Sequence, residues 1–191
     1  MIILASRSPQ RRGLLASLGL DVTVVASGEE EQSDPGLPAG ERVMAHARGK
    51  ARDVVARAGV PDGGAVLAAD TEVVLDGRAL GKPADATEAR AMLQALSGRA
   101  HQVMTGVVLV TAVGRQEVLE TAEVRFRPIS PGVMDWYIAR GEWHGRAGAY
   151  AIQGAGAALV EGITGDPACV IGLPVAAVAQ MLATEGLFPP G

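Results

Sequence analysis

Cysteine, histidine and aromatic residues are scarce in this sequence, which has one cysteine, three histidines, two tryptophans, two tyrosines and two phenylalanines. The single cysteine, Cys169, excludes an intrachain disulfide, and with only three histidines beside it a structural zinc site lacks ligands. Cys169 lies in an apolar stretch where a buried, inert thiol is the common case, so we expect no catalytic cysteine–histidine pair. The few aromatic rings argue against a protein that binds nucleic acid by stacking its bases.

Long hydrophobic runs and an excess of basic residues are also missing. The apolar run at residues 2–5 soon meets Arg7, which makes it too short for a signal peptide, and no run approaches the roughly 20 residues of a membrane helix. We therefore expect a cytoplasmic protein that does not enter a membrane. The net charge of −4 argues against a general nucleic-acid binder. A small anionic substrate remains compatible with it, because such a substrate needs only local positive charge.

What the sequence does contain is a foldable core, since 48% of its 191 residues are hydrophobic. That length fits a single domain over residues 1–191, which could consist of two closely merged lobes. Mixed strand and helix patterns predict an α/β protein with a mixed central sheet and flanking helices. The expected strands are residues 2–5, 22–25, 65–69, 73–75, 79–80, 102–113 and 116–126, with a glycine-rich loop and strand over 147–161. The expected helices are residues 9–18, 41–58, 85–96, 131–140 and 173–185.

The first group of residues that could carry chemistry is Ser6-Arg7-Ser8-Pro9-Gln10-Arg11, where a strand gives way to a helix. Ser8 is a good N-cap and Pro9 suits the first helical position. The start of a helix has free N–H groups and a partial positive charge that favour a phosphate, and Ser6, Ser8 and Arg11 could add donors. The glycine–lysine pattern of a P-loop is absent. A simple capped helix with solvated arginines explains the segment about equally well.

The second group follows the apolar run at residues 65–69, which we expect to end as a strand at Asp70. An acid at that place could hold Mg²⁺ or orient water, although a turn or capping aspartate is the commoner case. Asp76-Gly77 predicts a hairpin turn that would bring the chain, and Lys82, back toward Asp70. A lysine there could neutralise phosphate charge, whereas in isolation a solvated turn lysine is the simpler interpretation.

Two further groups are the acids at residues 29–31, followed by Lys50 on the next helix, and Gln153 in a glycine-rich stretch. The acids could be a solvated surface, or one of them could share a metal ion with Asp70. Gln153 offers both a donor and an acceptor, which suits the recognition of a base edge, whereas a plain glycine-rich turn is the alternative interpretation.

Together these segments resemble the Maf family of nucleoside triphosphate pyrophosphatases nearly end to end. The matching segments are Leu4–Pro9 with Arg11, Glu30-Glu31, Lys50-Ala51, Ala69-Asp70-Thr71, Gly81-Lys82-Pro83, Leu96-Ser97-Gly98, Ala147–Tyr150, Ile152-Gln153-Gly154 and Gly172-Leu173-Pro174. Each is weak alone, but their order and spacing are specific. The resemblance implies a nucleotide-binding cleft, a divalent cation (Mg²⁺ or Mn²⁺), a homodimer, and hydrolysis of a nucleoside triphosphate to the monophosphate and pyrophosphate.

The resemblance also assigns roles by position. Asp70 matches the proposed proton acceptor, and Asp70 with Glu30 would hold the metal ion. Lys50 and Lys82 match catalytic residues on the phosphate side. The substrate-binding positions correspond to Ser6, Ser8, Gln10, Arg11, Thr71 and Gln153.

The substrate branch is predicted by three of these positions. Thr71 and Gln153 match the branch that acts on dTTP and UTP, which has arginine where this chain has Gln10. A second branch, acting on 7-methyl-GTP, differs at all three positions. We therefore expect a dTTP/UTP-like enzyme with relaxed base preference. A nucleotide-binding regulator without hydrolysis and a nucleotidyltransferase remain as alternatives.

Overall fold

The computed structural model describes residues 1–29 and 36–189, and within these ranges it confirms an α/β protein with a mixed sheet. The strands are β1 (Ile2–Leu4), β2 (Val22–Val24), β3 (Ala65–Leu75), β4 (Arg78–Leu80), β5 (Ala100–Val110), β6 (Arg115–Phe126) and β7 (Val160–Thr164). The helices are α1 (Pro9–Ser17), α2 (Ala39–Ala58), α3 (Ala86–Leu96), α4 (Pro131–Ala139), α5 (Pro167–Ile171) and α6 (Val175–Thr184), with 3₁₀ turns at Ala147–Ala149 and Ala155–Leu159. None of the helices in the described ranges is long and apolar enough to cross a membrane.

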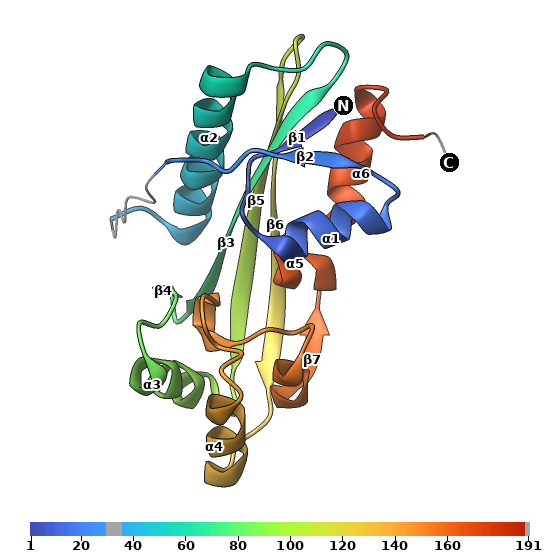
Figure 1. The fold of residues 1–191 in the computed structure, drawn as a ribbon. Coiled ribbons are helices and arrows are strands. Elements are labelled where there is room, and N and C mark those ends of the chain that lie inside the picture. The colour runs from blue at the N-terminus through green and yellow to red at the C-terminus, as the bar shows by residue number, and fades with distance from the viewer. Residues whose placement is uncertain (30–35, 190–191) are drawn as a thin grey trace.

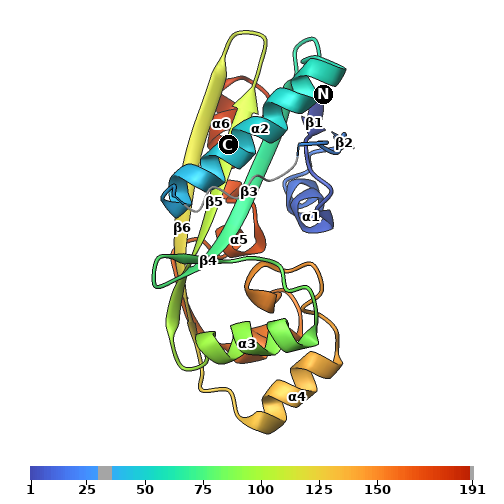
Figure 2. The ribbon, with the colours of Figure 1, turned by 90° about the vertical axis from the view of Figure 1, so that its left-hand side faces the viewer.

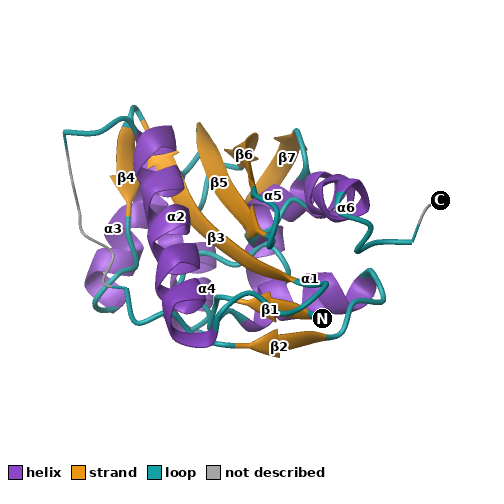
Figure 3. Cartoon of the chain, turned by 90° about the horizontal axis from the view of Figure 1, so that it is seen from above, coloured by secondary structure: helices purple, strands orange, loops and turns teal. Residues whose placement is uncertain are grey.

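Three long antiparallel strands, β3, β5 and β6, run the length of the molecule and join its two ends (Figure 1). The strand order is β2-β1-β3-β5-β6-β7, with β4 added to β3. At one end α2 covers one face of the sheet, while α1 and α6 cover the other (Figure 3). At the opposite end lie α3 and α4 (Figure 2). We call these ends the α2 lobe and the α3 lobe.

The core of the α2 lobe follows from strand alternation. Leu67 and Ala69 of β3 pack toward α1 and α6, whereas Ala68 between them packs toward α2. On α2, Val43 and Ala47 are fully buried, as the helical period predicts. Gly106 of β5 lets α2 approach, because a Cβ there would press on the side chains of α2.

The core of the α3 lobe is more aromatic than that of the α2 lobe. Leu93 and Leu96 of α3 and Tyr137 of α4 are fully buried against the far halves of β3, β5 and β6. Within it His101 packs edge-to-face against Phe126 and Tyr150, at centroid distances of 5.0 and 5.5 Å.

One prediction about β3 is wrong. Asp70 does not end a strand, because residues 66–74 pair continuously with β5 and the two predicted strands form one. Asp76 (φ 50°) and Gly77 (φ 77°) make the expected hairpin turn.

The free edge of β3 explains where a cleft can form. Residues 65–67 pair with β1 and residues 73–75 pair with β4. Among the described strands, residues 68–72 therefore have only β5 as a neighbour, so Asp70 and Thr71 lie at an open edge between the two lobes.

Candidate active site

A cavity of about 1030 Å³ lies at this open edge and is lined by residues of both lobes. Every predicted site residue that the structure describes lines it: Ser6, Ser8, Gln10, Arg11, Lys50, Asp70, Thr71, Lys82 and Gln153. Glu30, the remaining predicted metal ligand, lies outside the described residues. The cavity is large enough for a small-molecule ligand such as a nucleotide.

The start of α1 forms one wall of the cavity, and it is capped as the sequence predicts. Ser8 is the N-cap, with its hydroxyl 3.4 Å from the backbone N–H of Arg11, and Pro9 opens the helix. Ser6 Oγ accepts the N–H of Ser8 at 3.1 Å, and Ser8 Oγ donates to Gln10 Oε1 at 3.1 Å. This wall therefore presents hydroxyl groups and a helix N-terminus to the cavity.

Arg11 is buried beneath that helix start and ties three segments together. Its Nε donates to the carbonyl of Gly172 at 2.8 Å, and its two terminal nitrogens donate to Ser6 Oγ at 3.1 Å and Thr71 Oγ1 at 3.0 Å. Thr71 Oγ1 lies 2.9 Å from Thr105 Oγ1 on β5. The arginine thus places a fixed positive charge beside the cavity while joining α1, β3 and the loop after α5.

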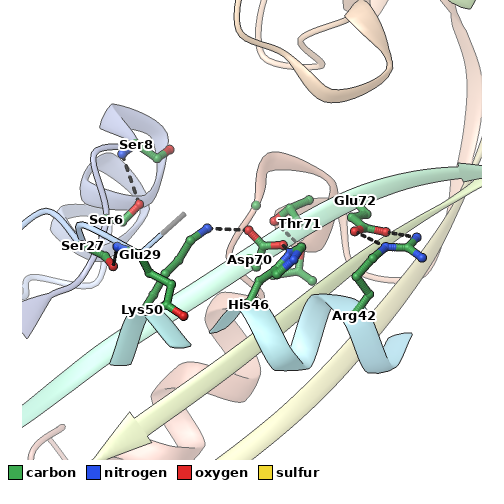
Figure 4. Close-up of polar contacts among 12 residues, drawn as sticks. Ser6, Ser8, Ser27, Glu29, Arg42, His46, Lys50, Asp70, Thr71 and Glu72 are labelled. Atoms are coloured by element: carbon green, nitrogen blue, oxygen red, sulfur yellow. Dashed lines mark hydrogen bonds and ion pairs between the residues drawn. The ribbon is translucent and has the colours of Figure 1, made fainter. Parts of the chain in front are cut away.

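Asp70 is 6% exposed and has two basic neighbours on α2 (Figure 4). Lys50 Nζ lies 2.6 Å from Oδ1, and His46 Nδ1 lies 3.2 Å from Oδ2. Burial alone would raise the pKa of Asp70, but the hydrogen bond with His46 and the charge of Lys50 outweigh it and lower the pKa to about 2. The carboxylate is therefore charged at neutral pH even though it is buried.

A second ion pair lies beside the first, and the two pairs form a row of charged residues between α2 and β3. Arg42 of α2 donates to both carboxylate oxygens of Glu72 at 2.8 and 2.6 Å (Figure 4). Arg42, His46 and Lys50 are spaced by four residues and share one helix face, while Asp70 and Glu72 are two apart and share one strand face. Sequence reasoning missed Arg42, His46 and Glu72. This matched spacing of bases and acids is the signal that could have found them.

Three ligand atoms in this row could hold a cation. The ligand atoms of His46, Asp70 and Glu72 lie within 4.8 Å of one another. Two carboxylates and an imidazole are a donor set that divalent metals accept, and the imidazole suits Mn²⁺ better than Mg²⁺. Lys50 and Arg42 already bind the two carboxylates, so an ion would use their remaining lone pairs.

The opposite wall comes from the α3 lobe. Lys82 follows β4 and is exposed, and Gln153 lies in a turn before the second 3₁₀ segment. The hairpin returns Lys82 to the cavity as predicted, but the lysine that contacts Asp70 is Lys50 of α2. Gln10 and Gln153 also line a second pocket of about 410 Å³ beside α1, so the two amides border the same space from opposite lobes.

Comparisons with known proteins agree with the resemblance in the motifs. The family described as Maf-like protein matches residues 1–185. A "dTTP/UTP pyrophosphatase" of Anaeromyxobacter sp. is 47% identical over 190 residues, covering 97% of this chain and 89% of that protein. One from Myxococcus xanthus is 46% identical, covering 98% and 93%, and one from Moorella thermoacetica is 47% identical, covering 97% and 95%. With a family match and relatives of this similarity over almost its whole length, the chain belongs to the Maf family.

Proposed function

We propose that this protein hydrolyses nucleoside triphosphates, dTTP and UTP included, to the nucleoside monophosphate and pyrophosphate. The relatives named above are dTTP/UTP pyrophosphatases. The observation that carries the proposal is Asp70, a buried carboxylate held ionised by Lys50 and His46 at the edge of a cavity that also contains the start of α1. Such a site offers a water-orienting group on one side and phosphate-binding groups on the other.

In the proposed mechanism the triphosphate lies along the start of α1, where Ser6, Ser8 and the helix N-terminus bind phosphate oxygens. A water molecule held by Asp70 attacks the α-phosphorus and gives up a proton to Asp70 or to solvent. The bond from that phosphorus to the bridging oxygen breaks, and pyrophosphate leaves. Phosphoryl chemistry of this kind needs position and charge stabilisation more than a covalent nucleophile. Lys50, Lys82 and Arg11 supply the positive charge.

A divalent cation, Mg²⁺ or Mn²⁺, fits the same row of residues. Asp70 would hold it, with His46 and Glu72 as the described residues close enough to share it. When bound, such an ion neutralises negative charge on the phosphates. Asp70 serves either as the proton acceptor for water or as a metal ligand, and its low pKa makes it a weak base.

In this proposal Thr71, Gln153 and Gln10 contact the base and select it. A neutral amide at position 10 replaces the arginine of the dTTP/UTP branch, and its oxygen accepts from Ser8. We infer that this exchange widens the set of accepted bases beyond thymine and uracil to modified nucleotides. The main alternative within the family is a preference for 7-methyl-GTP.

The test is a panel of canonical, methylated and deaminated triphosphates scored for pyrophosphate and monophosphate. We expect both products in equal amounts, with dTTP and UTP among the best substrates. Binding without products would support a regulator, and exchange of labelled pyrophosphate into the triphosphate would support a nucleotidyltransferase. Either result would overturn the proposal.

We further infer a single domain over residues 1–191 whose two lobes share β3, β5 and β6, a cytoplasmic location and a homodimeric state without nucleic acid. Light scattering on the purified protein tests the dimer. Thermal unfolding tests the single domain, for which we expect one cooperative transition.

A further inference from the structure

The backbone on both sides of Gln153 is held by hydrogen bonds from residues outside that segment. We call residues 151–156 the Gln153 loop. Its first residue, Ala151, donates its backbone N–H to Tyr137 Oη at 3.2 Å. At its far end, the N–H groups of Ala155 and Gly156 donate to the two carboxylate oxygens of Glu142, at 2.9 and 2.8 Å.

Glu142 lines the cavity, and its carboxylate is bound to the backbone of the Gln153 loop. Its carboxylate binds two successive backbone N–H groups, which is a charge-assisted arrangement stronger than a pair of neutral hydrogen bonds. The loop also makes room for it, because a Cβ at Gly154 would overlap the Glu142 carboxylate. Gly154 and Glu142 therefore fit each other, with Gln153 directly before that contact.

The residues next to Glu142 are buried and hydrogen-bonded. Glu142 lies in the turn after α4, next to Trp143, which is 6% exposed and donates its indole N–H to the carbonyl of Ile138 at 3.1 Å. Tyr137, the other anchor of the loop, is fully buried in the core of the α3 lobe, and burial raises the pKa of its hydroxyl. Both anchors thus come from α4 and its following turn, which pack into that core.

We propose that Glu142 is a positioning residue for base selection, which fixes the backbone behind Gln153 so that the amide meets the nucleobase at a set angle. This inference rests on the proposed function, in which Gln153 reads the base. Glu142 acts through the loop and not through a contact with the substrate. Its loss therefore changes the ratio between nucleotides more than the rate of hydrolysis.

The first experiment is a double-mutant cycle of Glu142→Gln and Gln153→Ala, read as the ratio of kcat/KM for dTTP to that for dCTP. Glutamine keeps the shape of Glu142 but can accept only one of the two N–H groups well. We expect Glu142→Gln to lower the ratio about tenfold, the effect of one lost hydrogen bond to a charged group, while kcat for dTTP changes less than about threefold. In the Gln153→Ala background the same change should leave the ratio within about twofold, because the two residues act as one unit.

Glu161→Gln is the matched control, because Glu161 is an exposed glutamate of β7 in the same lobe that does not line the cavity. It should leave the ratio at the wild-type value. An equal loss of selectivity from Glu142→Gln in both backgrounds would overturn the proposal, because Glu142 would then act independently of Gln153.

A second variant displaces the same carboxylate without changing Glu142 itself. Gly154→Ala places a methyl group where the Glu142 carboxylate lies, and the flexible side chain must swing out. The φ of Gly154 is negative, at −130°, and the overlap with the Glu142 carboxylate is the effect that this variant tests. We expect Gly154→Ala to reproduce the selectivity loss of Glu142→Gln, and unchanged selectivity would contradict the proposal.

Hydrogen exchange separates this inference from the proposed function, since it needs no substrate. The amides of Ala155 and Gly156 should exchange about tenfold faster in Glu142→Gln than in wild type, with core amides of β5 unchanged. If Gln153→Ala leaves base selectivity intact, the proposed role of Gln153 fails, and faster exchange still supports the anchor. Unchanged exchange at these two amides overturns the anchor even where the enzyme hydrolyses triphosphates as proposed.

Discussion

The two walls of the cavity are held in place by different means. On the α2 lobe, side chain meets side chain, and Asp70 and Glu72 are each matched by a cation of α2. On the α3 lobe, a carboxylate and a buried hydroxyl bind the backbone of the Gln153 loop. The first arrangement concentrates charge, as a phosphate site needs. The second fixes the shape of a loop, as the recognition of a base needs.

The two lobes also treat a buried titratable group in opposite ways. Asp70 has Lys50 and His46 beside it, and its pKa is lowered to about 2, which favours the charged form. His101 packs between Phe126 and Tyr150, and burial lowers its pKa to about 4, which favours the neutral form. The same direction of shift thus gives a charged site in one lobe and an uncharged core in the other.

The largest effect should come from Asp70→Asn. The variant keeps the size of the side chain but removes its charge and basicity, so we expect kcat/KM for dTTP to fall about a thousandfold. Asp135→Asn, in an exposed pair with Arg90, is the control and should be nearly silent. Near wild-type turnover by folded Asp70→Asn would remove Asp70 from the mechanism.

Lys50→Met should cost about a hundredfold in kcat/KM, because the site loses a positive charge for the phosphates. The pKa of Asp70 should rise at the same time, since Lys50 helps to hold it down. The acid limb of the pH–rate profile measures this, and it should move to higher pH. Arg48→Met is the matched control, as Arg48 lies on the same helix but pairs with Glu117. An unchanged rate in Lys50→Met would make the lysine purely structural.

His101 predicts the pH dependence of stability in the other lobe. Its folded pKa of about 4 lies below the ordinary value near 6.5, so the unfolded chain binds more protons between these pH values. Stability should therefore be full above pH 6.5 and fall as the pH drops, by about 2 kcal/mol at pH 4.5.

His101→Gln, which can still bond Tyr150, should remove that part of the decline. Urea unfolding at pH 7 and pH 4.5 measures the difference, with the exposed His144→Gln as control. Equal declines in wild type and His101→Gln would show that His101 does not titrate as its burial suggests.

His46→Leu tests the proposed cation site. Loss of the imidazole should weaken Mn²⁺ binding about tenfold and Mg²⁺ binding less, because only Mn²⁺ gains much from a nitrogen ligand. Calorimetry with each metal and the protein without nucleotide gives both constants. Equal affinities in wild type and variant would exclude His46 as a ligand.

Gln10→Arg should have the smallest effect. It restores the charge found in the dTTP/UTP branch, and we expect kcat/KM for UTP relative to a modified nucleotide such as 5-methyl-CTP to rise about threefold, the effect of a single half-buried contact. Competition between the two substrates in one reaction measures this ratio directly. A ratio that stays constant would place base selection elsewhere.

Much of the fold could be predicted from the sequence, because helix caps and turn residues indicated the same elements as the hydrophobic pattern. Ser8 and Pro9 started α1, Asp76-Gly77 formed the hairpin, and α3 at Ala86–Leu96 lies where the helix over 85–96 was predicted. The five-residue helix α5 was missed, although Asp166 before Pro167 is a cap signal of the same kind. Its short length gave no apolar period to recognise.

The site could be predicted from the sequence only in part. The motifs named nine of the lining residues, yet hairpin geometry pointed to Lys82 as the neighbour of Asp70, whereas the contact is made by Lys50. Glu72 of β3 and Arg42 of α2 went unnoticed because a charged residue in a strand or a helix looks like a surface residue until its partner is known.

The sequence by itself determined most of the elements, the capped start of α1 and nine of the residues that line the cavity, because these follow from spacing, turn chemistry and motif order. Only the tertiary structure decided the pairs, namely Lys50 with Asp70, Arg42 with Glu72, and Glu142 with the backbone behind Gln153. Strand and helix periods fix which side chains share a face. Which two faces meet depends on the burial of many apolar residues at once, and no local segment holds that information.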